Sequence, residues 1–453
     1  MNFIFISPQF PKTYWNFCDR LKRNGVNVLG IADTPYDQLD NKVKNSLTEY
    51  YRVYSLENYD EVYRAVAFFA FKYGKIDWLE SNNEYWLEQD AKLRTDFNIK
   101  TGVQSDEIWA FKSKFAMKKF YAKAGVPSAK CHWVTTLEEG LKFIQEVGYP
   151  VIVKPDNGVG ASDTHKLHNQ EEVERFYRSK PGIQYVMEEF INGNIYSYDA
   201  ITNQNGDPLF ETMTAWPPSI MDIVNDEKDL AYYVGNEIPE VLRDMGRRTV
   251  KAFNARNRFV HMEFFRLTEA KPGIGNVGDF AGLEVNMRPA GGYTPDMFNY
   301  AGSLDVYQIW ADVVSKQHSD VDQNQRKYYC VYAGRRDGKN YRHSDDEVMW
   351  NPRNGGADAV LGEQRVPPAG YHEPLLPPQA EGKTVPVFDL VALVLHDEKE
   401  MADVVGVLDG LPHVGLQHGA EGGLALALPQ PFDITNRLFR LALHDDGQAV
   451  FPA

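Results

Sequence analysis

The sequence predicts an α/β protein in three parts: a parallel sheet, then a longer region of mixed strands and helices, then a small C-terminal α/β segment. Two observations favour this fold class. Apolar runs of strand length alternate with stretches of helical spacing over the first hundred residues, and this rhythm changes near Asp106. A repeated β-α-β order is typical of a parallel sheet covered by helices. The length of 453 residues suffices for two or three domains with their own cores.

The first part, residues 1–104, shows the alternation most clearly. Strands are expected at Asn2–Ile6, Val26–Ile31 and Ile76–Leu79, and helices at Lys12–Asn24, Leu56–Tyr73 and about Glu84–Asp96. No G-x-G-x-x-G follows the first strand, where Ser7-Pro-Gln-Phe-Pro stands instead. A dinucleotide-binding fingerprint is therefore absent.

The second part, residues 105–325, is expected to hold most of the strands. Two helical stretches lead to Gly125-Val-Pro127, a pattern that ends a helix. Further helices are expected at Leu137–Val147, Ile238–Asn257 and about Ser303–Lys316, and strands near Cys131–Val134, Tyr149–Val153, Gln184–Phe190, Ile195–Thr202, Leu209–Thr214 and Arg258–Leu267 and in the run that carries Glu284.

The third part, residues 326–453, differs in composition. From residue 340 onward it has 17 acidic and 7 basic residues. The proline- and glycine-rich stretch Val366–Pro386 is predicted to be a linker or a long surface loop. Phe388–His396, Glu398–Leu411 and His413–Gln417 are expected to form one further β-α-β unit. These patterns leave the fold of the third part as a whole open.

Charge and cysteine content narrow the class of partners. The formal net charge of −15 argues against broad binding to nucleic acid or to an anionic membrane. Cys18, Cys131 and Cys330 lie far apart, which is typical of a reducing compartment and offers no disulfide framework or zinc spacing. No run reaches the ~18 apolar residues that a membrane span needs. These features predict a cytoplasmic protein.

The strongest candidate site lies on two strand-like runs. Glu284 and Asn286 alternate along one run, so they point to the same face, and Arg288 follows on that face if the strand continues. Glu263 alternates with His261 along the other run. Mg²⁺ prefers oxygen ligands that it shares with substrate phosphates, and arginine binds phosphate with two donors. A metal site is therefore favoured over an ion-pair network, whereas His261 alone is more typical of a hydrogen-bonded core residue.

Lys154 and the residues that follow it are candidates for phosphate binding. Lys154 ends an apolar strand, and the next loop contains Gly158 and Gly160, whose backbone N–H groups can approach a phosphate closely. The small side chain of Ser162 also lets the loop backbone lie close to a bound phosphate. Taken alone, the pattern is more typical of an ordinary strand-to-loop turn. It is not a P-loop, because G-x-x-x-x-G-K-[ST] is missing.

Other charged residues leave two interpretations open. Lys114 begins a helical stretch from which its side chain can reach over a site, whereas Lys118, Lys119 and Lys123 are more typical of a solvated helix face. Glu84 follows the third strand and could face a substrate, but it is more typical of an acid near a helix N-terminus.

The segment with Glu188, Glu189 and Ile191 ends one strand before the turn Asn192-Gly193. Such a segment can offer an acceptor for the amino group of adenine and a backbone N–H for its ring nitrogen. An acidic hairpin end explains the same residues equally well.

Taken in order, these motifs resemble the ATP-grasp superfamily, and within it carboxylate–amine ligases such as L-amino-acid ligases and carnosine synthases. The agreement in order and spacing extends over roughly residues 105–310, and the first hundred residues look like the pre-ATP-grasp domain. The resemblance implies an ATP-grasp fold with two α+β subdomains. Its pattern comprises Lys114, Gly125-Val-Pro127, Val153-Lys154-Pro155, Glu188-Glu-Phe-Ile-x-Gly193, His261-x-Glu263 and Glu284-x-Asn-x-Arg-x-x-Gly-Gly292.

The resemblance also implies roles for these residues. The ATP phosphates would be held by lysines and by the glycine loop, and adenine by the end of one strand. Mg²⁺, or Mn²⁺ in its place, would be held by two carboxylates and an amide, and a single catalytic arginine would stabilise the transferred phosphoryl group. The residues are Lys114, Lys154, Gly158, Gly160 and Ser162 for phosphates, Glu188, Glu189 and Ile191 for adenine, Glu263, Glu284 and Asn286 for metal, and Arg288 for catalysis.

The implied activity is ATP-dependent formation of an amide bond from a small carboxylate and an amine, through an acyl-phosphate. A homodimer is implied because such relatives are often dimers, and neither nucleic acid nor a membrane is an expected partner. One alternative is an ATP-grasp enzyme with another acceptor, which would be a carboxylase, thiol ligase or phosphotransferase. A second is a nucleotide-binding regulatory protein without turnover, against which the complete set of metal ligands argues.

Several features depart from the family pattern, among them Asp163-Thr164 in the glycine loop, which is unusual beside phosphates. Ile195 stands where many relatives carry a glutamate that binds ribose. Asn276–Phe280 belongs to an insertion that lengthens the hairpin between the two candidate metal strands.

Overall fold

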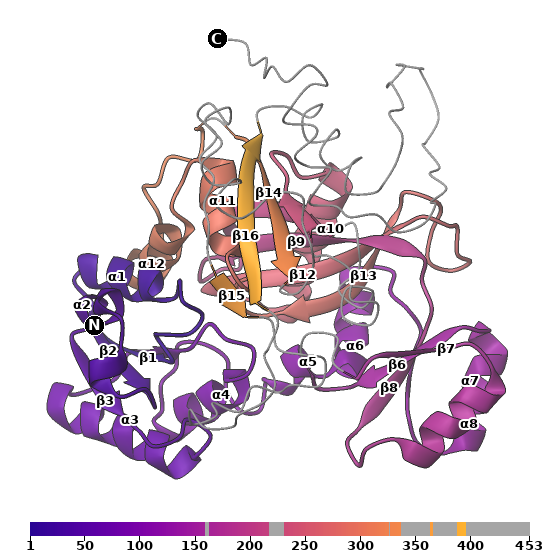
Figure 1. Ribbon diagram of the computed structural model, residues 1–453, viewed down its shortest axis with the longest axis horizontal. Coiled ribbons are helices and arrows are strands. Elements are labelled where there is room, and N and C mark those ends of the chain that lie inside the picture. The colour runs from indigo at the N-terminus through magenta and orange to yellow at the C-terminus, as the bar shows by residue number, and fades with distance from the viewer. Residues whose placement is uncertain (159–162, 217–230, 326, 337–362, 366–386, 396–453) are drawn as a thin grey trace, which may run out of the picture.

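The computed structural model describes residues 1–158, 163–216, 231–325, 327–336, 363–365 and 387–395. Three sheets organise these residues (Figure 1). The N-terminal sheet lies at the lower left of the view, a small antiparallel sheet at the lower right, and a large antiparallel sheet above and between them. No helix within the described ranges is long and apolar enough to cross a bilayer.

The N-terminal sheet has four parallel strands in the order β3-β2-β1-β4. Both faces are covered, because Phe3 and Phe5 enter one hydrophobic core and Ile4 and Ile6 enter another. The strands are β1 (Asn2–Ile6), β2 (Asn27–Ala32), β3 (Glu49–Arg52) and β4 (Trp78–Glu80), and the helices are α1 (Trp15–Arg23), α2 (Asn41–Ser46), α3 (Tyr59–Tyr73) and α4 (Leu87–Asp96), with a short 3₁₀ turn η1 (Tyr36–Gln38).

The small sheet has four antiparallel strands in the order β5-β8-β6-β7. Helices α7 and α8 cover one face of it, and Val151, Val153 and Met187 are buried beneath them (Figure 1). The elements are β5 (Cys131–Trp133), β6 (Val151–Pro155), β7 (His165–Leu167), β8 (Tyr185–Glu189), α7 (Leu137–Val147) and α8 (Gln170–Ser179).

The large sheet has eight strands in the order β13-β12-β9-β10-β11-β14-β16-β15, and every neighbouring pair is antiparallel. The strands are β9 (Gly193–Thr202), β10 (Pro208–Trp216), β11 (Ala231–Val234), β12 (Arg258–Leu267), β13 (Phe280–Asn286), β14 (Tyr329–Arg336), β15 (Glu363–Arg365) and β16 (Val387–Leu395). The helices around it are α5 (Trp109–Lys112), α6 (Lys114–Ala124), α10 (Glu240–Phe253), α11 (Thr294–Gly302) and α12 (Val306–Lys316).

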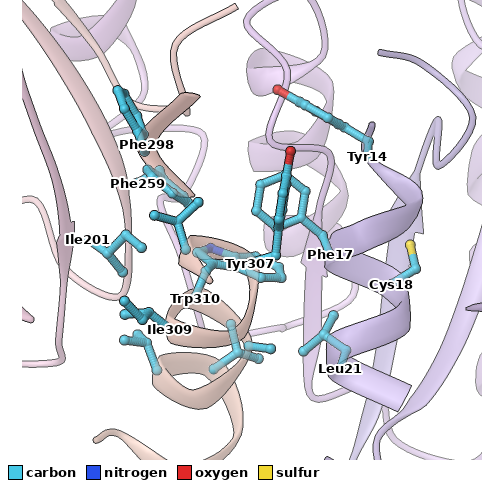
Figure 2. Packing of buried hydrophobic residues seen from close by; sticks show 14 of the residues in the cluster. Tyr14, Phe17, Cys18, Leu21, Ile201, Phe259, Phe298, Tyr307, Ile309 and Trp310 are labelled. Atoms are coloured by element: carbon cyan, nitrogen blue, oxygen red, sulfur yellow. The ribbon is translucent and has the colours of Figure 1, made fainter. Parts of the chain in front are cut away.

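An aromatic core joins the N-terminal sheet to the large sheet. Helix α1 packs against α12, and Phe17 of α1 meets Tyr307 and Trp310 of α12 at ring-centroid distances of 4.7 and 5.0 Å (Figure 2). Phe259 of β12 meets the same Phe17 ring at 6.0 Å. Buried aromatic pairs of this kind stabilise a structure through the large apolar area that they bury and through their preferred ring geometries. They therefore hold the end of β4 in a defined position relative to β12.

A glycine in β13 brings α6 close to the large sheet. A Cβ at Gly282 would lie 2.5 Å from the Tyr121 ring of α6, so only glycine fits beneath that ring. The backbone N–H of Gly282 also donates to the carbonyl of Pro127, 2.8 Å away. The first residue of α6, Lys114, is thereby held above the strand that carries Glu284.

The predicted fold class is confirmed: the structure is α/β, with an N-terminal parallel sheet followed by antiparallel sheets. Strand β12 has the predicted bounds, and β16 lies one residue before the strand predicted at Phe388–His396. Helix α11 was not predicted, although Pro295 near its start and Gly302 at its end are boundary signals. The segments expected at residues 398–417 and the loop expected at Val366–Pro386 lie outside the described residues. The three domain boundaries stay a prediction.

Candidate functional site

Strands β12 and β13 bring two carboxylates together. Glu263 lies directly opposite Glu284, and His261 lies directly opposite Asn286. Like charges placed opposite each other destabilise a strand pair unless a cation lies between or beside them. Both glutamates are partly exposed, with 25% and 22% of their side chains accessible. The oxygen donors of Glu263, Glu284 and Asn286 therefore lie together on neighbouring strands, as the alternation in the sequence predicts.

Lys114 supplies one cation to this pair. Its Nζ lies 3.1 Å from Oε1 of Glu284 and donates to the carbonyl of Gly158 at 3.0 Å. Burial raises the pKa of the Glu284 carboxyl, but Lys114 and Lys154 outweigh that effect and lower the pKa below its ordinary value. Glu284 is therefore held as a carboxylate, the form that a metal requires.

Asp156 fixes the beginning of α6, and it was not predicted. Its Oδ1 accepts from the Ser113 hydroxyl at 3.0 Å and from the backbone N–H of Phe115 at 2.9 Å. Ser113 in turn caps the helix through the N–H of Ala116. Because Asp156 follows β6 directly, the start of the glycine loop and the start of α6 are tied together. Its position after Lys154-Pro155 was the only signal in the sequence.

Glu188 lies between two lysines on the small sheet. Its two oxygens are each 2.7 Å from an ammonium group, that of Lys118 on one side and that of Lys154 on the other. Glu188 is 4% exposed. Burial opposes ionisation, but the two lysines outweigh it and lower the pKa of the Glu188 carboxyl to about 2. The three side chains form one charged cluster beside Glu284.

Replacing Glu188 with glutamine is expected to destabilise the protein by about 3 kcal/mol at pH 7. The substitution leaves Lys118 and Lys154 without their shared carboxylate. Because folding lowers the pKa of Glu188, its carboxylate stabilises the fold above the pKa of an unfolded glutamate. That contribution is lost as the pH falls from about 5 to about 2. Urea unfolding at several pH values measures it, and the difference between wild type and variant should shrink over this range. A constant difference would contradict the assignment.

The prediction for Lys118 is wrong. Its side chain is only 14% exposed and forms an ion pair with Glu188, so it does not belong to a solvated helix face. Lys114 and Lys118 are four residues apart in α6 and therefore share one face, which the sequence could have shown. Lys119 and Lys123 are exposed, as predicted.

The proposed adenine segment lies at the end of β8. The Glu189 carboxylate points away from that of Glu188, because successive side chains of a strand alternate. Its Oε1 accepts from the backbone N–H of Lys130 at 2.7 Å, and its Oε2 lies 3.4 Å from Nζ of Lys271. Lys271 lies in the connection between β12 and β13. Ile191 is buried in a small cluster with Ala129, Leu267 and Ala281.

His261 connects Glu263 to β9. Its Nδ1 lies 2.7 Å from Asp199 and its Nε2 lies 3.2 Å from Glu263. Burial lowers the pKa of the imidazole, but the two carboxylates outweigh it and raise the pKa to about 9. His261 is therefore a buried, hydrogen-bonded residue that orients Glu263. Asp199 was not predicted, although it faces His261 across the β9–β12 ladder.

Arg288 lies beyond the end of β13, because the strand stops at Asn286. Its guanidinium still reaches the site: Nη2 donates to Oδ1 of Asn286 at 3.4 Å, and Nε lies 3.3 Å from Oε2 of Glu84. Glu84 is held in turn by Nζ of Lys112 at 2.7 Å. The segment between β4 and α4 thus contributes a buried carboxylate beside the predicted catalytic arginine.

The donor set suits a divalent cation that also binds phosphate. Within the described ranges, no group of three or more histidine, cysteine, aspartate or glutamate side chains is arranged to hold a metal alone. Glu263, Glu284 and Asn286 offer two carboxylates and one amide oxygen, which fit Mg²⁺ when phosphate oxygens complete its shell. Gly160 and Ser162 lie outside the described residues, whereas the carbonyl of Gly158 faces Lys114.

Comparisons with known proteins agree on one fold. A family model described as an ATP-grasp domain matches residues 112–256. The chain is 22% identical to the L-arginine-specific L-amino acid ligase of Bacillus subtilis over 252 residues, which cover 52% of this chain and 57% of that protein. It is 34% identical to the alanine–anticapsin ligase of Bacillus subtilis over 97 residues, which cover 21% of this chain and 19% of that protein.

Among solved structures, the chain is similar to an L-amino acid ligase from Bacillus licheniformis. The TM-score is 0.63 at 16% identity, over 88% of this chain and 94% of that one. At this identity the likeness concerns the fold. The chain spans little more than half the length of the arginine-specific ligase, at 57%, and less of the anticapsin ligase, at 19%.

Proposed function

This chain belongs to the ATP-grasp superfamily, and we propose that it is an ATP-dependent carboxylate–amine ligase. The reaction would form an amide bond through an acyl-phosphate and release ADP and phosphate. The observation that carries the proposal is the meeting of Glu263, Glu284 and Asn286 with Lys114 and Arg288 at one place.

Such a site suits the activation of a carboxylate. A free carboxylate resists attack by an amine, because an oxide would have to leave. Transfer of a phosphoryl group to it creates a good leaving group, and positive charge stabilises the moving phosphoryl. When bound, Mg²⁺ would neutralise phosphate charge and orient the transferring group.

The residues of the chain would share the remaining work. Lys114 and Lys154 would bind phosphate oxygens, and Arg288 would stabilise the phosphoryl group in transfer and then the acyl-phosphate. Glu188, Glu189 and Ile191 would hold adenine. Glu263, Glu284 and Asn286 would hold the metal, with His261 fixing the orientation of Glu263.

The comparisons support an amino acid as one substrate. Two relatives are named as ligases of amino acids, and one solved structure of similar fold is an L-amino acid ligase. We propose that the amine is an amino acid or a similar small molecule, and that the partner substrate is a small carboxylate.

The experiment that tests the proposal measures ADP and phosphate release with Mg·ATP and pooled amino acids and small carboxylates. Release that requires both a carboxylate and an amine, together with an amide product in mass spectra, supports the ligase. Release with a thiol in place of the amine would replace the proposal with a thiol ligase, and release with bicarbonate in place of the carboxylate would replace it with a carboxylase. Nucleotide binding without release under any combination would favour a regulatory protein.

Replacing Lys118 with methionine is expected to raise the KM for ATP about 10-fold, since one charge-assisted hydrogen bond is worth about 1.5 kcal/mol. Lys118 and Lys154 share Glu188, so loss of Lys118 leaves Lys154 as the partner of Glu188 and disfavours its bond to a phosphate. Lys119→Met is the matched control, because Lys119 is exposed on the same helix. Equal KM values for the two variants would contradict this role.

A further inference from the structure

The backbone just after β13 is held in an unusual way. The ladder between β12 and β13 ends at the pair His261–Asn286, whereas β12 continues to Arg258 beside β9 alone. The carbonyl of Met287 therefore has no place in that ladder. It accepts instead from the guanidinium of Arg258, from Nε at 3.1 Å and from Nη2 at 2.9 Å. Met287 lies between the candidate metal ligand Asn286 and the candidate catalytic residue Arg288.

Arg258 is buried and needs a counter-charge. It is 3% exposed, and its Nη2 lies 3.5 Å from Oε2 of Glu80, which is 4% exposed. Removing one partner of a buried ion pair leaves a costly uncompensated charge. Glu80 is the last residue of β4, so the charge that holds Arg258 in place comes from the N-terminal sheet.

The end of β4 is itself fixed. Arg94 of α4 is fully buried and donates from Nη1 to the Leu79 carbonyl at 2.8 Å and to Oε2 of Glu80 at 3.3 Å. Its Nε donates to the Val103 carbonyl at 2.8 Å. A chain of contacts therefore links Arg94 of α4 to Glu80, Glu80 to Arg258, and Arg258 to the Met287 carbonyl. The position of this carbonyl affects the backbone of the two adjacent residues, Asn286 and Arg288.

We propose that Arg258 is a positioning residue for phosphoryl transfer, held by Glu80 and acting through the Met287 carbonyl. The proposal rests on the function proposed above, because it assigns Arg258 to the placement of Asn286 and Arg288. Two donors on one carbonyl fix its direction as well as its distance, which a single bond from lysine does not. Residues that support metal ligands in this way affect metal affinity and rate together.

The test compares Arg258→Met and Arg258→Lys with wild type. Arg258→Met removes both donors, whereas Arg258→Lys keeps a buried charge for Glu80 and one donor for Met287. Arg248→Met is the matched control: Arg248 also donates from its guanidinium to backbone carbonyls, those of Ala124 and Gly125 at the end of α6. Each protein is assayed for ATP turnover per folded molecule and, by calorimetry, for binding of ADP with and without Mn²⁺.

Arg258→Met is expected to lower kcat about 10- to 100-fold and to weaken Mn²⁺-dependent ADP binding about 10-fold. The affinity for ADP without metal should stay within about 3-fold of wild type, because Arg258 contacts Met287 and Glu80 and is not among the residues proposed to hold the nucleotide. Arg258→Lys should recover part of both losses, and Arg248→Met should show neither. Because Arg258→Lys keeps the buried charge, it decides the matter if Arg258→Met does not fold.

Wild-type kcat and wild-type Mn²⁺-dependent binding in Arg258→Met, or in Arg258→Lys if Arg258→Met does not fold, would overturn the proposal. An effect on thermal stability alone would also overturn it, since that is what a purely structural arginine predicts. Failure of the ligase itself looks different: wild-type protein would show no amine-dependent turnover. The Mn²⁺ titration would then still decide whether Arg258 positions the metal ligands.

Discussion

Replacing Glu284 with glutamine is expected to lower the rate of ADP release at least ~100-fold. The amide keeps the size of the side chain but loses the charge that faces Lys114 and that a metal needs. The KM for Mg²⁺ should rise as well, because Glu263 and Asn286 would remain as the only protein donors of this set. Initial rates at varied Mg²⁺ and saturating ATP measure both effects.

Glu211→Gln is the control for this substitution. Glu211 lies on β10 of the same sheet and pairs with Arg247 and Tyr198, away from the candidate metal donors. It should keep wild-type Mg²⁺ dependence even if its stability falls. A Glu284→Gln variant with the same Mg²⁺ dependence as Glu211→Gln would remove Glu284 from the metal site.

Replacing Arg288 with methionine is expected to lower kcat on the order of 1,000-fold, the scale at which a transition-state arginine acts in phosphoryl transfer. The side chain already lies beside Asn286 and is oriented by Glu84, so its guanidinium is fixed before substrates bind. The affinity for ADP should change little, since the proposed contact is with the transferring group. Steady-state kinetics with calorimetric ADP binding separates the two quantities.

Arg266→Met is the matched control for Arg288. Arg266 lies near the far end of β12, where its guanidinium faces the Tyr196 ring at 5.9 Å. A similar loss of kcat in both variants would attribute the effect to general destabilisation. A loss of ADP affinity in Arg288→Met with unchanged kcat would assign Arg288 to ground-state binding instead.

The convergence of Glu263, Glu284 and Asn286 could be predicted from the sequence, because strand alternation is a local property. The position of Lys154 at the end of a buried strand was predictable for the same reason. The path of the chain after Asn286 was not predictable from the sequence. The strand pairing ends at Asn286, and the Met287 carbonyl that follows accepts a hydrogen bond from the Arg258 side chain instead of from a neighbouring strand.

Contacts between distant segments were the least predictable part of the site. The sequence predicts Lys118 as a surface residue, because nothing near it in the chain indicates that Glu188 of the small sheet lies against α6. Glu80 and Glu84 carry no local signal of their partners, since Arg258 and Arg288 are about two hundred residues away in the sequence. The aromatic core between α1 and α12 positions the N-terminal sheet against the large sheet and so makes the contacts of Glu80 and Glu84 possible. This core depends on how the ring of Phe17 fits against Tyr307 and Trp310, which are nearly three hundred residues away in the sequence.

The measurement that tests the central claim most directly uses a carboxylate substrate labelled with ¹⁸O in both oxygens. An acyl-phosphate route passes one labelled oxygen to phosphate when the amine displaces it, so mass spectra of the released phosphate should show one ¹⁸O per amide formed. Unlabelled phosphate, or AMP in place of ADP, would contradict activation through an acyl-phosphate and with it the proposed ligase mechanism.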